Sequence, residues 1–210
     1  MNSPAPAFSV RPYRPDDLGA LYDVCLKTGD TGEDATGLYD DPKLLGHLYA
    51  APYAVLEPDL TFVLEDGGGV CGYVLGAFDS GVFYDRLETE WFPPLRKQYP
   101  EPNGNESLTR DERIVKQLYD EPQKSPFFEA YPSHLHIDLL PRAQGSGNGR
   151  TLMETFLGAL KDRGSRGVHL GTSPRNTRAE QFYLKMGFYE LKRREPYHLV
   201  MGRKLVASGE

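Results

Sequence analysis

The chain has 210 residues, of which 39% are hydrophobic, 26% charged and 11% aromatic. This composition is typical of an ordinary globular protein, and we expect a single domain over residues 1–210 with a sizeable core. The formal net charge of −6 argues against nucleic acid as a partner, because phosphate binding needs clustered lysine and arginine. The one basic run, Lys192–Arg194, lies between Glu190 and Glu195, and we interpret it as a solvated strand edge.

Targeting signals and cysteines point to the same compartment. No apolar stretch approaches 18 residues, and the first residues lack the apolar core of a signal peptide, so we expect neither a membrane partner nor secretion. Cys25 and Cys71 lie inside apolar patterns, which favours buried thiols in a reducing compartment. A cytoplasmic location is therefore expected.

The first part of the chain alternates strand and helix signals. Residues 8–13 alternate in polarity and predict a strand. A helix is expected from Pro15, because two acids follow that proline and one face carries Leu18, Leu21, Tyr22 and Cys25. Residues 28–39 form a loop rich in glycine, aspartate and threonine, and a second short helix is expected within residues 41–53.

A β-hairpin and a long excursion follow. Two β-rich runs, Leu60–Leu64 and Val70–Phe78, flank a glycine-rich turn at Asp66–Gly69, which predicts a hairpin. Residues 79–132 are rich in proline, tyrosine and charge, and are too long for a plain loop. Two stretches within them have helical spacing, so we expect a helical insertion that shapes a site.

The second part again alternates strand and helix. Strands are expected at residues 133–140 and 166–172, and at two runs around Pro196. Apolar stripes predict helices over residues 152–160 and 176–186, the second ending at Gly187. This order of elements favours a mixed α/β sheet in one domain.

Between the strand at 133–140 and the helix after it stands the stretch "PRAQGSGNGRTL", residues 141–152. A strand that runs through glycines into a helix leaves several backbone N–H groups unpaired at the positive end of the helix dipole. Such a turn binds anions, above all phosphate. A P-loop is excluded because no Lys-Ser/Thr pair follows the last glycine, and Arg150 breaks the dinucleotide-binding pattern.

This stretch resembles the acetyl-CoA signature of the GCN5-related N-acetyltransferases (GNAT): a strand, a proline, Gln144 and the alternating glycines before a helix. Downstream, "NTRAEQFYLKMGF" resembles the second cofactor segment of that family, with Asn176 and Tyr183 seven residues apart. The resemblance implies a mixed, mostly antiparallel central sheet flanked by helices, with the insertion between strands 3 and 4. It also implies acetyl-CoA as cofactor and N-acetyl transfer to an amine as the reaction.

Residue by residue, the resemblance places cofactor contacts on three segments. The N–H groups of the glycine turn would hold the pyrophosphate, and the following residues supply them: Gln144, Gly145, Ser146, Gly147, Asn148, Gly149 and Arg150. The backbone of Ile137, Asp138 and Leu139 would pair with the pantetheine arm. Asn176 would hold that arm from the other side, and Tyr183 is the candidate general acid for the thiolate.

The general base is less defined by the resemblance. Asp138 lies on the polar face of the strand with His134 and His136, beside the expected thioester, and is our candidate. Some members of the family use a glutamate five residues before the asparagine, where this chain has Gly171. His134, His136 and Asp138 also permit a metal hydrolase as an alternative, although we assign no metal because the resemblance gives this strand to the cofactor.

A narrower resemblance is to the acetyltransferase-like C-terminal domain of O-GlcNAcase enzymes, in "FVLEDGGGVCGYVLG" and the Tyr- and Pro-rich insertion. It leaves open an alternative function, a catalytically weak or inactive module that binds acetyl-CoA or a partner. Asp30, Glu33 and Asp34 could hold a cationic amine, or could belong to a solvated acidic loop. The acceptor is a small-molecule or protein amine, and the C-terminal strands could support a homodimer.

Overall fold

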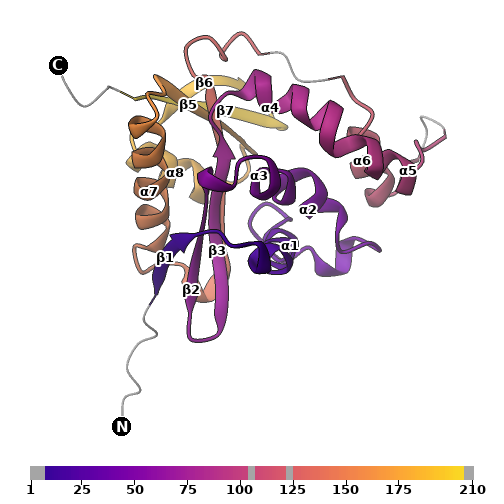
Figure 1. The fold of residues 1–210 in the computed structure, drawn as a ribbon, viewed down its shortest axis with the longest axis horizontal. Coiled ribbons are helices and arrows are strands. Elements are labelled where there is room, and N and C mark those ends of the chain that lie inside the picture. Colours follow the sequence, from indigo (N-terminus) through magenta and orange to yellow (C-terminus); the bar gives the residue numbers. More distant parts are fainter. Residues whose placement is uncertain (1–7, 104–106, 122–124, 206–210) are drawn as a thin grey trace.

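The computed structural model describes residues 8–103, 107–121 and 125–205. A seven-stranded mixed sheet of order β1-β2-β3-β4-β5-β7-β6 forms its centre (Figure 1). All neighbouring pairs are antiparallel except β4 and β5, which confirms the predicted fold class. The strands are β1 Ser9–Pro12, β2 Thr61–Asp66, β3 Gly69–Ala77, β4 Ser133–Leu139, β5 Gly167–Thr172, β6 Tyr189–Arg194 and β7 His198–Lys204.

Helices cover both faces of this sheet, with α7 and α8 on one side and α1, α2 and α3 on the other (Figure 1). The predicted second helix is two helices, because Ala50 leaves helical geometry and Pro52 begins a new first turn. Of the described residues, no helix is both long and apolar enough to cross a membrane. The helices are α1 Leu18–Leu26, α2 Leu44–Tyr49, α3 Ala51–Leu56, α4 Ser80–Arg86, α5 Phe92–Gln98, α6 Arg110–Gln117, α7 Asn148–Asp162 and α8 Thr177–Lys185.

The core on the α7 side depends on close approach between helix and sheet. Helix α7 packs against β2, β3 and β4, and Phe156 is fully buried in that contact. Gly76 of β3 lies directly beneath it, since a Cβ there would come within 2.6 Å of the Phe156 ring and 2.1 Å of the His134 carbonyl oxygen. Position 76 must therefore be glycine for α7 to pack closely on the sheet. This packing matters for the site because the glycine turn leads into α7.

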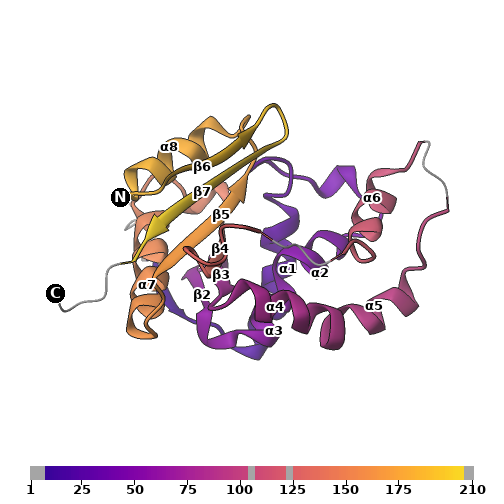
Figure 2. The ribbon, with the colours of Figure 1, turned by 90° about the horizontal axis from the view of Figure 1, so that it is seen from above.

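The segment between β3 and β4 contains α4, a π-helical turn at Leu87–Trp91, α5 and α6. Helices α5 and α6 lie beyond α1 and α2, away from β5–β7 (Figure 2). Side chains tie the segment to α2: the Trp91 indole donates to the His47 carbonyl at 2.8 Å, and Tyr49 donates to Gln117 at 2.8 Å. The segment thus braces α2, whose residues border the site described next.

One irregularity of the sheet creates that site. Strands β4 and β5 pair only at their first residues, Ser133 with Val168 and His134 with His169. Beyond that point the two parallel strands diverge, and the rest of β4 has a neighbour on its β3 side alone. A sheet opened in this way exposes one row of backbone hydrogen-bonding groups in the middle of the molecule.

Candidate active site

A cleft of about 750 Å³ occupies the opening between β4 and β5. It is bordered by the end of α1, the loop after it, the glycine turn before α7 and the start of α8. Most of the predicted site residues line it: Glu33, Ile137, Asp138, Leu139, Gln144, Gly145, Gly147, Gly149, Arg150, Asn176 and Tyr183. Four others, Asp30, Asp34, Ser146 and Asn148, lie outside this lining.

The glycine turn presents a continuous row of N–H groups. Gly145 and Gly147 have φ of 83° and 81°, a conformation that glycine adopts without steric cost. The first N–H of α7 with a carbonyl partner is that of Thr151, which bonds to Gly147. Across the described part of the chain, the N–H groups from Gly145 to Arg150 make no backbone hydrogen bond. They meet the positive end of the α7 dipole, which is the arrangement of an anion site.

Two amide side chains hold this turn in shape from beneath. Gln144 donates to the Leu139 carbonyl at 2.7 Å, and Asn148 donates to the Ala143 carbonyl at 2.9 Å. Asn148 is buried, so its side chain supports the turn from within. The turn is thus preorganised before any ligand binds.

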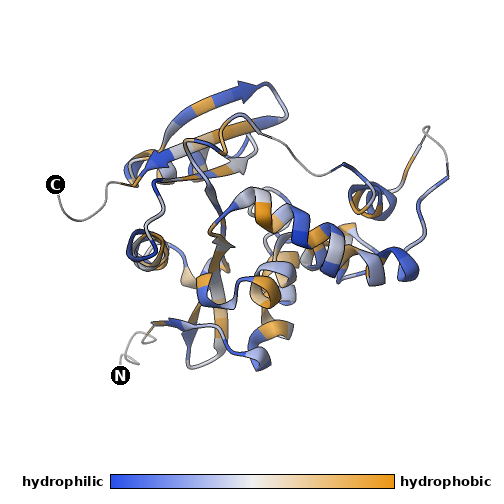
Figure 3. Ribbon diagram, turned by 45° about the horizontal axis from the view of Figure 1, so that its top comes forward, coloured by the Kyte–Doolittle hydropathy of each residue, from blue (hydrophilic) through white to orange (hydrophobic). Residues whose placement is uncertain are grey.

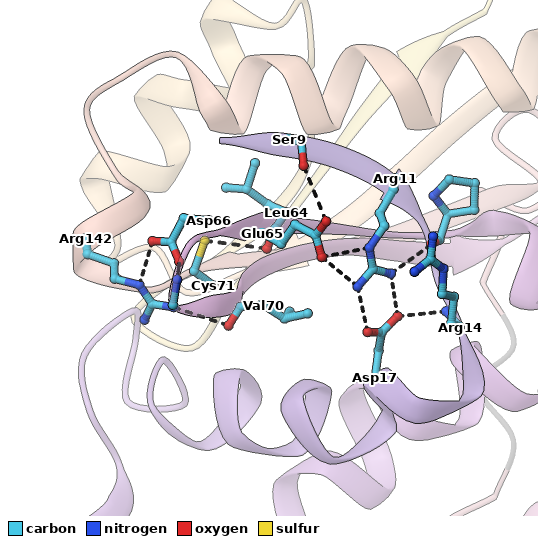
Figure 4. A network of polar contacts seen from close by, with 12 residues as sticks. Ser9, Arg11, Arg14, Asp17, Leu64, Glu65, Asp66, Val70, Cys71 and Arg142 are labelled. Atoms are coloured by element: carbon cyan, nitrogen blue, oxygen red, sulfur yellow. Dashed lines mark hydrogen bonds and ion pairs between the residues drawn. The ribbon is translucent and has the colours of Figure 1, made fainter. Parts of the chain in front are cut away.

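An arginine anchors the start of the turn to the β2–β3 hairpin (Figure 4). Arg142 donates to Asp66 at 3.0 Å and to the Val70 carbonyl at 3.4 Å. Bonds from the guanidinium and from the Gly68 N–H hold the pKa of Asp66 below its usual range. Sequence reasoning missed Arg142, because its partner is 76 residues away in the chain.

Cationic side chains surround the mouth of the cleft near the glycine turn. Arg150, Arg175, Arg178 and Lys185 all line it, although the protein as a whole carries a net charge of −6. Arg175, Arg178 and Lys185, which lie on or just before α8, were not among the predicted site residues. Basic residues do, however, flank Asn176 in the sequence. Cations beside unpaired N–H groups fit a ligand with several phosphates, as coenzyme A has.

The edge of β4 that faces the cleft has free backbone groups. Leu140 donates its N–H to Cys71 of β3, and antiparallel pairing alternates, so Asp138 also bonds to β3 through its backbone. The backbone groups of Ile137 and Leu139 therefore point the other way, toward the cleft. The Leu139 carbonyl accepts a hydrogen bond from Gln144. The N–H of Leu139 and the N–H and C=O of Ile137 therefore stay free for a ligand.

The Asp138 side chain lies on the opposite side of the sheet from α7. Tyr73 of β3, a fully buried residue, donates to Asp138 Oδ2 at 2.7 Å. Burial raises the pKa of Asp138 above its ordinary value, although the Tyr73 bond opposes that rise. A carboxylate with a raised pKa and one engaged oxygen can accept a proton at the other.

Tyr183 of α8 is 7% exposed and faces the same cleft. Burial, and after it the Asp138 carboxylate, raise the pKa of Tyr183 well above the ordinary phenol value. The phenol therefore keeps its proton throughout the physiological range. A proton donor and a proton acceptor thus line one cleft.

A chain of hydrogen bonds sets the protonation of the histidines on β4. Ser80 donates to the Pro132 carbonyl at 2.6 Å, so it accepts from His134 Nδ1 at 2.8 Å. His134 Nε2 then accepts from the Tyr53 hydroxyl at 2.9 Å, and His136 Nε2 donates to the Tyr53 oxygen at 3.1 Å. His136 is thereby left with an unprotonated Nδ1.

These bonds do not suit the metal alternative. Both nitrogens of His134 and one of His136 are engaged in the chain through Tyr53, and one oxygen of Asp138 is engaged by Tyr73. Over residues 8–103, 107–121 and 125–205, no group of three or more His, Cys, Asp or Glu side chains is arranged to hold a metal ion. Burial lowers the pKa of His136 to about 4, so the ring is neutral at pH 7.

Asn176 connects α8 to the loop at residues 28–39. Its Oδ1 accepts the Ala179 N–H at 3.0 Å as the cap of α8, and its Nδ2 donates to the Thr31 carbonyl at 3.1 Å. Within that loop Glu33 reaches the cleft. Asp30 pairs with Glu33 through the backbone, and Asp34 accepts from the N–H and hydroxyl of Thr36 at 2.8 and 2.6 Å.

Gly171 of β5 lines the cleft. It stands at the position where some members of the family that the glycine stretch resembles carry a glutamate. A Cβ at that position would lie 2.7 Å from His198 Nε2. A side chain at position 171 would therefore have to displace the His198 ring.

Comparisons with known proteins agree with this geometry. Protein O-GlcNAcase of Rattus norvegicus is 31% identical over 205 residues, and that of Mus musculus is 30% identical over 203. Each match covers 94% of this chain and 22% of the relative, so the chain spans about a fifth of the length of these curated relatives.

Solved structures extend the comparison. SsHAT, known from a crystal structure, is 45% identical in sequence with a TM-score of 0.89, and the match covers 96% of this chain and all of that one. Salmonella typhimurium yncA with its cofactor acetyl-CoA shares the fold, at 13% identity, a TM-score of 0.59 and 97% coverage of each chain. The model of the Acetyltransferase (GNAT) family matches residues 28–188, and the chain belongs to that family.

Proposed function

We propose that this chain transfers an acetyl group from acetyl-CoA to an amine acceptor. The observation that carries the proposal is the opening between β4 and β5, where the free edge of β4, the glycine turn and the side chains of Asp138 and Tyr183 line one cleft. Acetyl-CoA would supply a thioester, so a carbon–sulfur bond is exchanged for a carbon–nitrogen bond. An ammonium acceptor gives up two protons, of which one is released and the other is balanced by the proton that reaches the sulfur.

The residues of the cleft suit each part of that cofactor. The N–H groups of Gly145–Arg150, with Arg175 and Arg178, would hold its phosphates. The free backbone groups of Ile137 and Leu139 would pair with its amide arm as an added strand pairs with a sheet edge. One of those donors would also polarise the thioester carbonyl.

The chain's own side chains would move the two protons. Asp138 would accept the proton of the acceptor amine, directly or through water, because its raised pKa brings its basicity closer to neutrality. Tyr183 would protonate the departing sulfur, because burial keeps the phenol in its neutral form. Asn176 would act by holding the loop at Thr31 over the cleft.

The acceptor would carry a cationic amine before it reacts. Glu33 lines the cleft, and Asp30 and Asp34 stand in the same exposed loop, so this loop would attract an ammonium group. The alternative is a module that binds acetyl-CoA without turnover. The bare backbone at Gly171 favours it, since that position offers no base.

Calorimetric titration of CoA, acetyl-CoA and ATP into the purified chain tests the cofactor assignment. We expect saturable one-to-one binding of CoA and acetyl-CoA but not of ATP, and loss of that binding in Gly147→Glu. Position 147 has open space around it but a φ of 81°, so the glutamate acts both through its charge at the phosphate site and through the strain that a side chain puts on the turn. Unchanged affinity in Gly147→Glu would refute the glycine turn as the phosphate site.

Release of the CoA thiol in the presence of amines tests turnover. We expect Tyr183→Phe and Asp138→Asn to lower the rate by about 10²-fold or more while leaving CoA affinity nearly intact, as general acid–base groups do. Asp138→Asn should also remove the acidic limb of the pH profile. Binding of CoA without thiol release for any amine would favour the non-catalytic module.

A further inference from the structure

The β6–β7 hairpin carries a cationic cluster that the cofactor cleft does not include. Lys192, Arg194, Tyr197 and His198 line a separate hollow of about 390 Å³. Tyr197 is 74% exposed, and the Arg194 guanidinium lies 6.0 Å from its ring centre. Strand β6 is hydrophilic along most of its length (the uppermost strand in Figure 3), and it forms one edge of the sheet.

Arg193 differs from its two neighbours on β6, Lys192 and Arg194, in its ion pairs. Arg193 forms ion pairs with Glu180, Glu190 and Glu195, so its charge is compensated on the face that carries α8. Throughout the described ranges, Lys192 and Arg194 have no carboxylate within ion-pair distance, and they extend from the other face. Two uncompensated cations beside this hollow form a local positive field on an acidic protein.

The register of the sheet shows which face this is. His134 and Asp138 share one face of β4, because side chains two and four residues apart point the same way. His134 pairs with His169 of β5, with ring centres 5.7 Å apart. Gly171 is two residues after His169, so it lies on that face as well.

The same face continues onto the hairpin. A Cβ at Gly171 would lie 2.7 Å from His198, and His198 is opposite Arg194 in the β6–β7 pairing. Lys192 is two residues before Arg194 and shares its face. The cationic cluster and the candidate base Asp138 therefore lie on one face of the sheet, and Gly171, which lines the cleft, joins them.

From this juxtaposition we infer that the acceptor is a polypeptide with acidic side chains near its reactive amine, held by Lys192 and Arg194. The inference rests on the proposed acetyl transfer. It names the acceptor class that such a site would select.

Distance favours a polypeptide over a small amine. Paired strands lie about 4.8 Å apart, so two to three spacings would separate β4 from β7 and β6 by roughly 10–14 Å. Because β4 and β5 diverge beyond His134, the separation at Asp138 is larger than that. An extended peptide advances about 3.4 Å per residue, and it therefore needs about three to four residues or more to span this distance. An amine at Asp138 and a carboxylate at the cluster would belong to one extended segment.

Fluorescence anisotropy with labelled peptides tests this inference. The probes are eleven-residue peptides with one central lysine, and with either Glu or Ser at the positions three and four residues away on both sides. Binding is measured to the full chain with and without CoA, so that the readout does not depend on turnover. We expect the Glu peptide to bind about fivefold tighter, as two partly screened ion pairs would give, and the preference to fall as salt rises.

Charge-reversal variants identify the cluster. Lys192→Glu/Arg194→Glu should abolish the preference for the Glu peptide and favour a peptide with Lys at the same flanking positions. The matched control Lys161→Glu/Arg166→Glu makes the same change in net charge at the opposite end of β5, and should retain the preference. Circular dichroism of both variants checks that the fold is kept.

Equal binding of the Glu and Ser peptides, or a preference that survives Lys192→Glu/Arg194→Glu, would overturn the inference and leave the cluster as protection of an edge strand. The proposed function fails separately. Preferential binding of the Glu peptide without release of the CoA thiol would refute acetyl transfer, and would keep the acidic segment as the ligand of this face.

Discussion

Replacement of Tyr53 by phenylalanine removes one oxygen atom on which two buried histidines depend. The ring of Tyr53 stacks on Phe83 with centres 4.4 Å apart, and phenylalanine preserves that contact. What disappears is the hydroxyl, which lies 2.9 Å from His134 Nε2 and 3.1 Å from His136 Nε2. The change therefore probes hydrogen bonding with almost no change in packing.

The magnitude follows from which histidine can find another partner. His136 lines the cleft, so water can replace the hydroxyl there. His134 is 4% exposed, and its other nitrogen must donate to Ser80 because Ser80 itself donates to Pro132. An unpaired buried acceptor costs about 1–3 kcal/mol. We expect Tyr53→Phe to lower the free energy of unfolding by about 2 kcal/mol and Tm by roughly 4–8 °C in a chain of this size.

Urea unfolding followed by circular dichroism at pH 7.5 measures this loss. An unchanged m-value shows that the wild type and Tyr53→Phe expose equal surface on unfolding. Tyr197→Phe is the matched control, because Tyr197 is 74% exposed and should change stability by less than about 0.5 kcal/mol. A loss in Tyr53→Phe no larger than in Tyr197→Phe would refute the bridging role. Nitrogen chemical shifts of His136 should show protonation at Nε2 in the wild type and a mixture of tautomers in Tyr53→Phe.

Two further predictions concern the glycine turn and the candidate base. Arg142→Ala should weaken CoA binding with little change in Tm, because Arg142 anchors the turn to Asp66 at an exposed position; unchanged affinity in calorimetry would show that the turn holds itself. Because burial raises the folded-state pKa of Asp138, the stability linked to its proton is complete below its ordinary pKa and is lost as pH rises through the raised value. Asp138→Asn should therefore raise Tm at pH 8 relative to the wild type and lose that advantage near pH 4. In Asp34, hydrogen bonds from Thr36 lower the pKa, so Asp34→Asn should give no such gain at pH 8.

Local sequence patterns predicted much of the fold. The turn at Asp66–Gly69, the stop at Gly187 and the apolar stripe of α7 follow from short-range stereochemistry, and the helices and strands stand close to where those patterns predict them. The pattern missed the division between α2 and α3, where Pro52 starts a second helix inside a continuous apolar run, and it also missed α5 in the insertion. The glycine turn was predictable for the same reason, since its row of free N–H groups lies on consecutive residues.

The remaining site residues depend on contacts between distant parts of the chain. Tyr73 reads as one more apolar residue of a hairpin, and only the pairing of β3 with β4 brings its hydroxyl to Asp138, 65 positions later. Tyr53 becomes a bridge between histidines because α3 packs over β4. The acids of the 28–39 loop are equivalent in sequence, yet Glu33 alone among Asp30, Glu33 and Asp34 lines the cleft.

By itself, then, the sequence determined the order of elements, the glycine turn before α7 and the family to which that turn belongs, because each depends mainly on short-range patterns. The tertiary structure decided where β4 and β5 separate, which backbone groups are free, and which face each charge occupies. The run Lys192–Arg194 shows the physical reason: strand geometry sends Arg193 to the carboxylates of one face and its two neighbours to the face of Asp138, and only the register of the whole sheet relates that face to the cleft.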